Sequence, residues 1–330
     1  MKIGLIVGGI DHFLRPIESE LHTRYQVDRF KPGFVRLPLI GTRVNDWLLR
    51  RQLHQFIAYH DVTFFEWASS LLVQASHLPR RGRIVTRLHS VELATAATQV
   101  QWSHVDTVIV LNEAIHHRLS ALANAPLRDV AIVPNGVSLE KFHPKKCKFS
   151  YRLGMVCNLL PIKRVYEMLL TLYQLRQDGH PFTLRIAGKA GEGEVQRYVW
   201  AMQNLIAKLC LEEYVAFDGY VENVSGWLQA VDVFISNSYW EGQSVALIEA
   251  MASGCYCLSH CWDGVEEVLP PEHIFTTDGD LRAKLLAYAA LPEADKQQAQ
   301  AQMRAIAEEK FDERRMVRQI IEVIEQVARG

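Results

Sequence analysis

The feature that most constrains the fold is a regular alternation along the chain between short apolar runs and longer segments with helical periodicity. Apolar runs of strand length occur at residues 2–7, 62–65, 84–88, 107–111 and 130–133. Strands that alternate with helices are typical of a parallel sheet whose strands are joined by helical crossovers. The first part of the chain is therefore predicted to be an α/β domain.

A turn-rich passage at residues 134–144 has an Asn-Gly pair and two prolines, and the alternation starts again after it. Expected strands follow at 151–156, 182–187, 215–217, 233–236 and 256–259, with helices at 164–177 and 194–208. Since 330 residues suffice for two domains, we predict two Rossmann-like domains, 1–148 and 149–313, with parallel sheets that face each other across a cleft. The amphipathic final segment, 314–330, is expected to pack back onto the first domain.

Composition argues against several classes of protein. The formal net charge of −1 disfavours nucleic acid as a partner, because proteins that bind it carry a basic surface. No apolar run reaches the ~18 residues of a membrane span. The start, MKIGLIVGGID, is predicted to be a strand and not a signal peptide. We therefore expect a cytoplasmic protein, with any membrane contact made peripherally on the inner face.

Two segments resemble metal sites, and for both a simpler interpretation is expected. The run CYCLSHC at 255–261 alternates like a buried strand and lacks paired C-x-x-C spacing, so its thiols are expected to be reduced and metal-free. Asp278-Gly-Asp280 resembles a D-x-D metal motif but precedes a helical segment. Asp280 is therefore expected to be an N-cap and Asp278 a turn residue. Neither a metal nor a cofactor is predicted.

Two glutamates eight residues apart, Glu241 and Glu249, follow the expected strand 233–236 in the most apolar part of the chain. A helix is predicted at 244–253, and free N–H groups at its start favour an anion. A diphosphate bound there would place a sugar near one glutamate and a ribose near the other. The alternative is that Glu241 is only an acidic helix-start residue and Glu249 the partner of a buried basic side chain.

Several short motifs occur in the order found in one enzyme family. The stretch 241–254, EGQSVALIEAMASG, resembles the E-x7-E signature of the retaining glycosyltransferases of family 4, the group 1 enzymes with the GT-B fold. Gly8-Gly9 is similar to their glycine loop and Arg87-Leu-His89 to their active-site histidine segment, and 133–137 and 215–221 match two further motifs. The resemblance covers most of the chain.

This resemblance implies roles for individual residues. Glu241 would hold hydroxyls of the donor sugar and Glu249 those of the ribose, while Lys163 would neutralise the departing phosphates. His89 would face the reacting sugar. Further donor-site positions implied by the resemblance are Gly9, Asn158, Arg164, Val221, Gln243, Ser244 and Val245.

Two positions depart from the family pattern. Asn158 stands where the family usually pairs an arginine with the lysine, which weakens the stabilisation of a departing diphosphate. Two alternatives stay open: either Arg164 or Lys189 compensates, or the chain is slow or inactive. The acidic residue after the glycine loop is Asp11, which we group with the acceptor site.

The implied reaction transfers a sugar, with retention of configuration, from a nucleotide sugar to a glycan or glycolipid acceptor. A UDP-sugar is the first expectation, and cell-surface polysaccharide or lipopolysaccharide synthesis is the expected setting. The resemblance implies that no metal is required. Two alternatives stay open at this point: a nucleotide-sugar epimerase of the same fold, and a non-catalytic module that binds nucleotide or glycan.

The acceptor side is less strongly indicated. Glu66 and Trp67 follow the strand 62–65 and are expected to bind an acceptor sugar, although Trp67 also suits a core position. Region 22–51 carries seven basic and two acidic residues interleaved with apolar ones, a pattern that fits contact with an anionic membrane surface. The alternative is that the apolar stripe packs on the sheet and the arginines are solvated.

Overall fold

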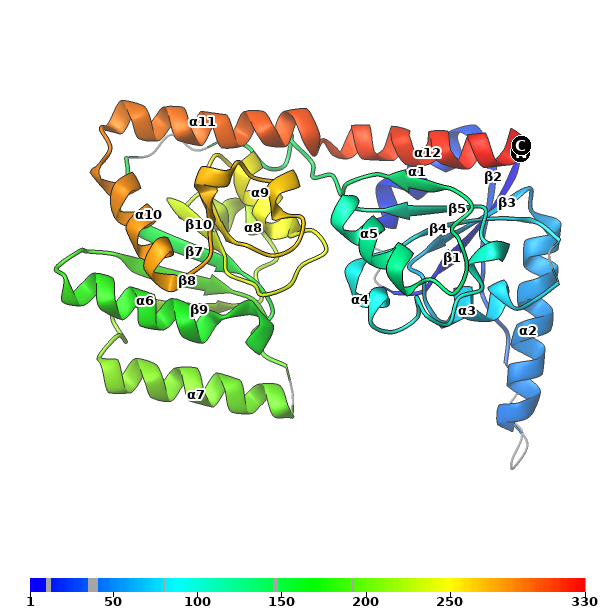
Figure 1. The fold of residues 1–330 in the computed structure, drawn as a ribbon, viewed down its shortest axis with the longest axis horizontal. Helices are drawn as coiled ribbons and strands as arrows, with labels where there is room; N and C mark the ends of the chain where they lie inside the picture. Colours follow the sequence, from blue (N-terminus) through cyan, green and yellow to red (C-terminus); the bar gives the residue numbers. More distant parts are fainter. Residues whose placement is uncertain (10–12, 35–40, 80, 145–147, 192, 330) are drawn as a thin grey trace. The chain divides into compact units, whose positions relative to one another are not determined.

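The computed structural model describes residues 1–9, 13–34, 41–79, 81–144, 148–191 and 193–329. The chain divides into two compact units, Met1–Asn135 with Glu313–Gly330, and Gly136–Asp312 (Figure 1). The division therefore lies at 135/136 and not at the expected 148/149. Val137 and Phe142 explain the difference, because both are buried in a core cluster of the second unit. The Val137 N–H also donates to the Phe311 carbonyl in that unit.

The first unit contains a parallel sheet of six strands in the order β2-β1-β3-β4-β5-β6. Its strands are β1 (Lys2–Val7), β2 (Gln26–Arg29), β3 (Val62–Glu66), β4 (Arg83–Arg87), β5 (Thr107–Val110) and β6 (Val130–Ile132). The central strands are buried along their length, which explains their continuous apolar runs. Strand β2 has no such run, because it forms one edge of the sheet.

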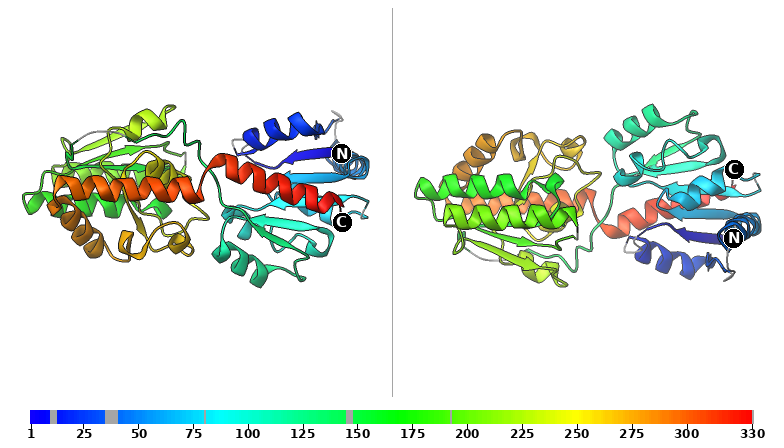
Figure 2. Two further views of the ribbon diagram at one scale, coloured as in Figure 1. Left: turned by 90° about the horizontal axis from the view of Figure 1, so that it is seen from above. Right: turned by 90° about the horizontal axis from the view of Figure 1, so that it is seen from below.

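Helices of the first unit are α1 (Leu14–Arg24), α2 (Gly41–Tyr59), α3 (Ser70–Ser76), α4 (Ser90–Leu93), α5 (Glu113–Leu122) and α12 (Glu313–Arg329). Helix α12 comes from the far end of the chain and lies beside α1 against β3, β4 and β5 (Figure 2). Its apolar stripe, with Met316, Ile320 and Ile324, is buried with Leu14 and Ile17 of α1 in one cluster. This burial makes the last helix an integral part of the first unit.

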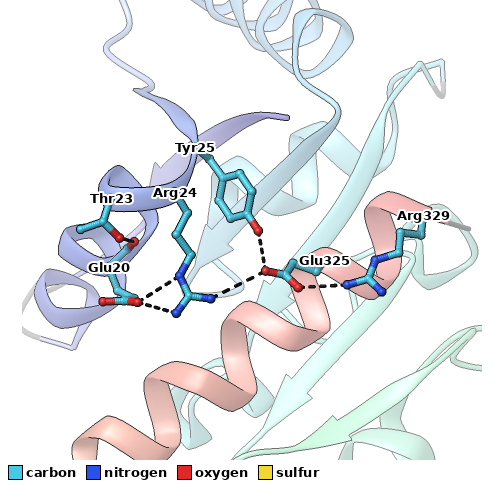
Figure 3. A network of polar contacts seen from close by, with 6 residues as sticks. All are labelled: Glu20, Thr23, Arg24, Tyr25, Glu325 and Arg329. Atoms are coloured by element: carbon cyan, nitrogen blue, oxygen red, sulfur yellow. Dashed lines mark hydrogen bonds and ion pairs between the residues drawn. The ribbon is translucent and has the colours of Figure 1, made fainter.

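Polar contacts at the end of α12 supplement its apolar packing (Figure 3). The Tyr25 hydroxyl donates to the Glu325 carboxylate, and this hydrogen bond raises the pKa of Tyr25. Glu325 also pairs with Arg24, 4.0 Å away, and with Arg329, 3.0 Å away. These contacts are exposed or partly exposed, so they add little to the free energy of unfolding and mainly orient α12.

The second unit contains a parallel sheet of six strands in the order β12-β11-β10-β7-β8-β9. Its strands are β7 (Arg152–Val156), β8 (Thr183–Ala187), β9 (Val215–Gly219), β10 (Val233–Ser236), β11 (Tyr256–His260) and β12 (Ile274–Phe275). Its helices are α6 (Val165–Gln177), α7 (Glu194–Leu209), α8 (Val224–Leu228), α9 (Val245–Ala252), α10 (Asp278–Ala290) and α11 (Glu293–Lys310).

Two apolar clusters cover the two faces of this second sheet. Helices α6, α7 and α10 pack on one face around Leu169, Met202 and Leu285. Helices α8, α9 and α11 pack on the other, around Met251 and Met303. Among the described residues, no helix is both long enough and apolar enough to cross a membrane.

The order of the strands reverses once in each sheet, and these positions locate the expected binding sites. In the second unit the chain runs outward from β7 through β8 and β9 and then returns to β10 on the other side of β7. In the first unit the reversal lies between β1 and β3. Ligands of open α/β sheets bind at the carboxyl ends of the strands at such switch points, because the flanking loops diverge there.

Gly188 supports the switch point of the second unit, and its substitution tests this packing. A Cβ at Gly188, where φ is 151°, would lie 1.7 Å from the Cys157 carbonyl oxygen after β7. We expect Gly188→Ala to lower the free energy of unfolding by about 3 kcal/mol, since neither strand can move without repacking. Gly279→Ala is the control, because its nearest neighbour is 3.8 Å away. Equal urea midpoints for the two variants would contradict this packing.

Candidate functional site

Lys163 and Glu241 meet at the switch point between β7 and β10. Lys163 ends a 3-10 turn (Pro161–Lys163) after β7, and Glu241 lies in the loop after β10. The Lys163 Nζ is 2.5 Å from Glu241 Oε1, and the Ser238 hydroxyl donates to the same oxygen at 2.6 Å. Both charged side chains are partly exposed. The pair thus carries opposite charges at an accessible edge of the sheet.

The start of helix α9 lies directly after this pair in the chain. Ser244 is the N-cap, but its side chain accepts no capping hydrogen bond. The first N–H groups of a helix have no partner within the helix, so Val245 and Ala246 present amides and the positive end of the helix dipole. Gln243 and Ser244 are buried beside them. The predicted helix and its left-handed Gly254, with φ 71°, are confirmed, apart from one residue at each end.

Glu249 lies further along α9, partly buried. Burial raises the pKa of its carboxyl from 4.5 to about 7, and Lys141 opposes the shift. Within the described part of the chain, its carboxylate accepts no hydrogen bond. The alternative in which Glu249 serves a buried basic partner is therefore not supported. A carboxylate of this kind is available to hydroxyl donors of a ligand.

The pH dependence of stability reports this burial. Since the pKa of Glu249 is higher in the folded than in the unfolded protein, the carboxyl favours folding below about pH 4.5, and this contribution is lost as the pH rises through about 7. We expect Glu249→Gln to melt roughly 4–8 °C above the wild type at pH 8. At pH 5 the two melting temperatures should converge. A constant difference at both pH values would show that the titration of Glu249 is not the cause.

Arg164 does not lie with Lys163 as a second cation. Its guanidinium is buried and donates to Asn237, 3.0 Å away, and to Asp278, 2.6 Å away. Asn158 is exposed on the loop after β7. Lys189 is also exposed, with its Nζ 4.4 Å from the centre of the Tyr220 ring. The expectation that Arg164 compensates for Asn158 is therefore wrong, because Nη1 and Nη2 of its guanidinium already donate to Asn237 and Asp278.

The motif Asp278-Gly-Asp280 forms the first turn of α10. Thr277 is the N-cap, and its hydroxyl accepts from the Asp280 N–H at 3.1 Å. The expectation that Asp280 is the N-cap is thus wrong, because the helix begins three residues earlier than predicted. Among the described residues, no group of three or more His, Cys, Asp or Glu side chains is placed to hold a metal ion.

In the first unit, a buried charged cluster occupies the carboxyl ends of β3 and β4. Glu66 has no exposed surface, and its Oε1 lies 3.0 Å from His89 Nε2 and 3.5 Å from Arg87 Nη1. Arg87 also donates to Asn135 at 2.5 Å. Burial lowers the pKa of His89 despite the Glu66 contact. Because Glu66 is enclosed and engaged by these residues, its expected contact with an acceptor is corrected to a role in holding His89.

Aromatic rings enclose His89 on both sides. The Trp67 ring stacks at 4.0 Å between centroids and the Phe13 ring at 5.5 Å. A Cβ on Gly9 would lie 2.8 Å from the Trp67 ring, so this glycine allows β1 and Trp67 to approach. Trp67 is partly exposed and has a left-handed φ of 79°, which is uncommon for a bulky residue. Asp11 lies outside the described residues.

Some contributors to these sites were not found from the sequence. Asn237 and Ser238 bind Arg164 and Glu241, and the signal was their position directly after β10. Glu92 accepts from the His89 N–H at 2.7 Å, and burial raises the pKa of Glu92 to about 7. Val221, a donor-site position implied by the resemblance, is partly buried after β9 and packs against a core cluster.

The arrangement defines a class of protein with two Rossmann-like units, and solved structures share it. HepE of Anabaena, solved with UDP-glucose, superposes with a TM-score of 0.80 at 20% identity, over 99% of this chain and 100% of HepE. Sucrose-phosphate synthase of Thermosynechococcus elongatus gives a TM-score of 0.78 at 15% identity, over 99% of each chain. The fold is therefore GT-B, as predicted.

Sequence comparisons find similarity to one family of glycosyltransferases. Residues 150–298 match the family model described as "Glycosyl transferases group 1". The amylovoran biosynthesis glycosyltransferase AmsK of Erwinia amylovora is 26% identical over 264 residues, which are 75% of this chain and 63% of AmsK. An Escherichia coli UDP-Gal:α-D-GlcNAc-diphosphoundecaprenol α-1,3-galactosyltransferase is 28% identical over 142 residues, 39% of this chain and 36% of that enzyme. Over residues 150–298, the chain is therefore similar to the group 1 glycosyltransferases.

The matches to curated relatives are partial. The chain spans between 36% and 63% of the length of the two relatives above. The family model covers the second unit, where Lys163, Glu241 and Glu249 lie. The family-model match thus lies in the unit for which nucleotide-sugar binding is predicted.

Proposed function

We propose that the protein is a retaining glycosyltransferase that moves a sugar from a nucleoside-diphosphate sugar, a UDP-sugar first, to a glycan or glycolipid acceptor. The observation that carries the proposal is the Lys163–Glu241 pair beside the uncapped start of α9, with Glu249 on the same helix. The relatives named for amylovoran biosynthesis and for a diphosphoundecaprenol acceptor support synthesis of cell-surface polysaccharide or lipopolysaccharide. The match of residues 150–298 to the group 1 family model supports the transfer reaction itself.

Donor binding would use the contacts of the second unit. The diphosphate would accept hydrogen bonds from the amides at the start of α9 and a charge contact from Lys163. Lys163 is paired with Glu241 without a ligand, so the incoming phosphates compete for it and leave Glu241 to accept hydrogen bonds from the sugar. Glu249 would accept hydrogen bonds from the ribose hydroxyls, which favour its charged form.

The chemical step would depend on electrostatic stabilisation of the leaving diphosphate. As the glycosidic bond breaks, negative charge grows on the phosphate oxygens, and Lys163 and the helix amides are preorganised to receive it. The departing phosphate accepts the proton of the acceptor hydroxyl, so no separate general base is required. We propose that no metal is required either. With Asn158 in place of an arginine, Lys163 would be the principal cation of this step.

His89 would face the reacting sugar and Trp67 would bind the acceptor, while Gly9 stays a proposed donor-site position. His89 is held by Glu66 and by two aromatic rings, so its orientation is fixed before any ligand binds. A partly exposed indole such as Trp67 suits stacking against the apolar face of a sugar.

The non-catalytic alternative is favoured by one observation, the exposed Asn158 without a second cation. It predicts nucleotide binding without sugar transfer or donor hydrolysis.

Two variants test the donor site. Glu249→Ala should weaken binding of free UDP by tenfold or more, because it removes a charged acceptor of hydroxyl hydrogen bonds. Glu241→Ala should leave the UDP affinity unchanged or higher, since Lys163 is released, and should weaken the intact UDP-sugar by tenfold or more. Isothermal titration calorimetry measures both dissociation constants, after a thermal-shift panel of UDP, GDP, ADP, CMP and dTDP sugars has selected the donor.

The outcomes separate the proposed activities. If both variants bind both ligands like the wild type, the site assignment is wrong. Isomerisation of the nucleotide sugar without an acceptor would indicate the epimerase. Binding of nucleoside diphosphate with neither transfer nor slow donor hydrolysis would indicate the non-catalytic module.

We further propose that the protein docks peripherally on the cytoplasmic face of an anionic membrane through an α2 basic face, comprising Arg43, Trp47, Arg50 and Arg51. Trp47 is 59% exposed, and the Arg51 guanidinium lies 5.4 Å from its ring centre. The three arginines on this face are exposed. Leu53 of the same helix is buried, so only part of the apolar run packs in the core. An exposed indole amid basic side chains suits an anionic lipid surface.

Vesicle binding tests this docking. The wild type should sediment with vesicles of 30% phosphatidylglycerol in phosphatidylcholine. Each Lys or Arg side chain near an anionic lipid surface contributes about 1 kcal/mol to the binding free energy. Arg50→Glu with Arg51→Glu should lower the bound fraction at least fivefold. Arg315→Glu with Arg318→Glu makes the same charge change on α12 and should leave binding near the wild-type level. Equal loss in both double variants would show a dependence on net charge alone.

A further inference from the structure

Arg164 follows Lys163 directly and has a strained backbone. Its φ and ψ are 51° and 38°, in the left-handed region that residues other than glycine rarely occupy. It is also the N-cap of α6, so the chain turns from the Lys163 loop into the helix at this residue. Strain of this kind is unfavourable and persists where the surrounding contacts require it.

The contacts that fix Arg164 come from two other segments of the chain. Nη1 donates to Asn237, in the loop after β10, and Nη2 to Asp278, at the start of α10. Asn237 Nδ2 donates back to the Arg164 carbonyl at 2.8 Å. The guanidinium carbon lies 4.9 Å from the centre of the Tyr239 ring. One buried side chain therefore connects the loops after β7 and β10 with the start of α10.

The two loops held together by Arg164 are those that carry the Lys163–Glu241 pair. Lys163 is its neighbour in sequence, and Glu241 is four residues beyond Asn237. A backbone hydrogen bond from the Tyr239 N–H to the Ile162 carbonyl, at 2.9 Å, joins the same loops. The Arg164 contacts and this bond thus lie on both sides of Lys163 in one segment and just before Glu241 in the other. Movement of either loop would change the distance between Lys163 Nζ and Glu241 Oε1.

We infer that Arg164 is a positioning residue, which sets the geometry of Lys163 and Glu241 through Asn237 and Asp278 and does not itself contact the donor. This inference rests on the proposed donor site. A planar guanidinium can hold an amide and a carboxylate at once in fixed directions, which an ammonium group cannot do. Because the side chain is buried, its removal leaves Asn237 and Asp278 without their partner and lets the loops relax.

Two substitutions separate positioning from stability. Arg164→Gly removes the guanidinium but suits the left-handed backbone, whereas Arg164→Lys keeps a charge and the backbone strain. Both substitutions remove the pair of guanidinium hydrogen bonds to Asn237 and Asp278. We expect both variants to bind the selected nucleotide sugar at least tenfold more weakly than the wild type, even though their melting temperatures differ. The dissociation constant of the corresponding nucleoside monophosphate should change less than twofold, because that ligand lacks both the β-phosphate and the donor sugar.

Arg152→Lys is the matched control. Arg152 pairs with Asp232 at the opposite, amino ends of β7 and β10, with Nε and Oδ2 3.4 Å apart. It should alter stability without altering either dissociation constant in calorimetry. Wild-type affinities in both Arg164 variants would overturn the inference, as would equal loss of monophosphate binding. If the wild type itself binds no nucleotide sugar, the proposed function fails, and this inference fails with it.

Discussion

The ion pair between Lys163 and Glu241 is the contact around which the candidate donor site of the second unit is arranged. It forms where strand order reverses, and the loops after β7 and β10 meet there through this pair and through the backbone hydrogen bond from the Tyr239 N–H to the Ile162 carbonyl. A lysine and a glutamate at 2.5 Å are a strong pair without a ligand, yet both remain partly exposed. The site is thus closed by an interaction that an anionic ligand can replace.

The surrounding residues keep the polar groups of this site in place. Arg164 connects the two loops, Ser238 adds a hydrogen bond to Glu241, and buried apolar residues of α9 anchor the helix whose start follows the pair. Gly188 permits the close approach of β8 to the backbone after β7. The first unit has a comparable design, in which Glu66 and two aromatic rings hold His89 at the carboxyl ends of its strands.

Much of the fold could be predicted because strands buried on both faces must be apolar and their crossovers must have helical periodicity. Strands β1 and β10 and helix α9 follow this rule closely. The rule fails at the edge strand β2, which has no apolar requirement. It also fails at the unit boundary, because Val137 and Phe142 join a core without forming a regular element of their own. Spacing placed Glu241 and Glu249, but it could not show that Arg164 and Glu66 are enclosed, since partners distant in sequence decide that.

The central claim is that the start of α9, between Glu241 and Glu249, receives the diphosphate of a nucleotide. A crystal structure of the protein with bound UDP tests it most directly. The account predicts phosphate oxygens on the amides of Ser244 and Val245 and on Lys163 Nζ, with the ribose hydroxyls on Glu249 and the Lys163–Glu241 contact lengthened. UDP bound elsewhere, with that contact still at 2.5 Å, would contradict it.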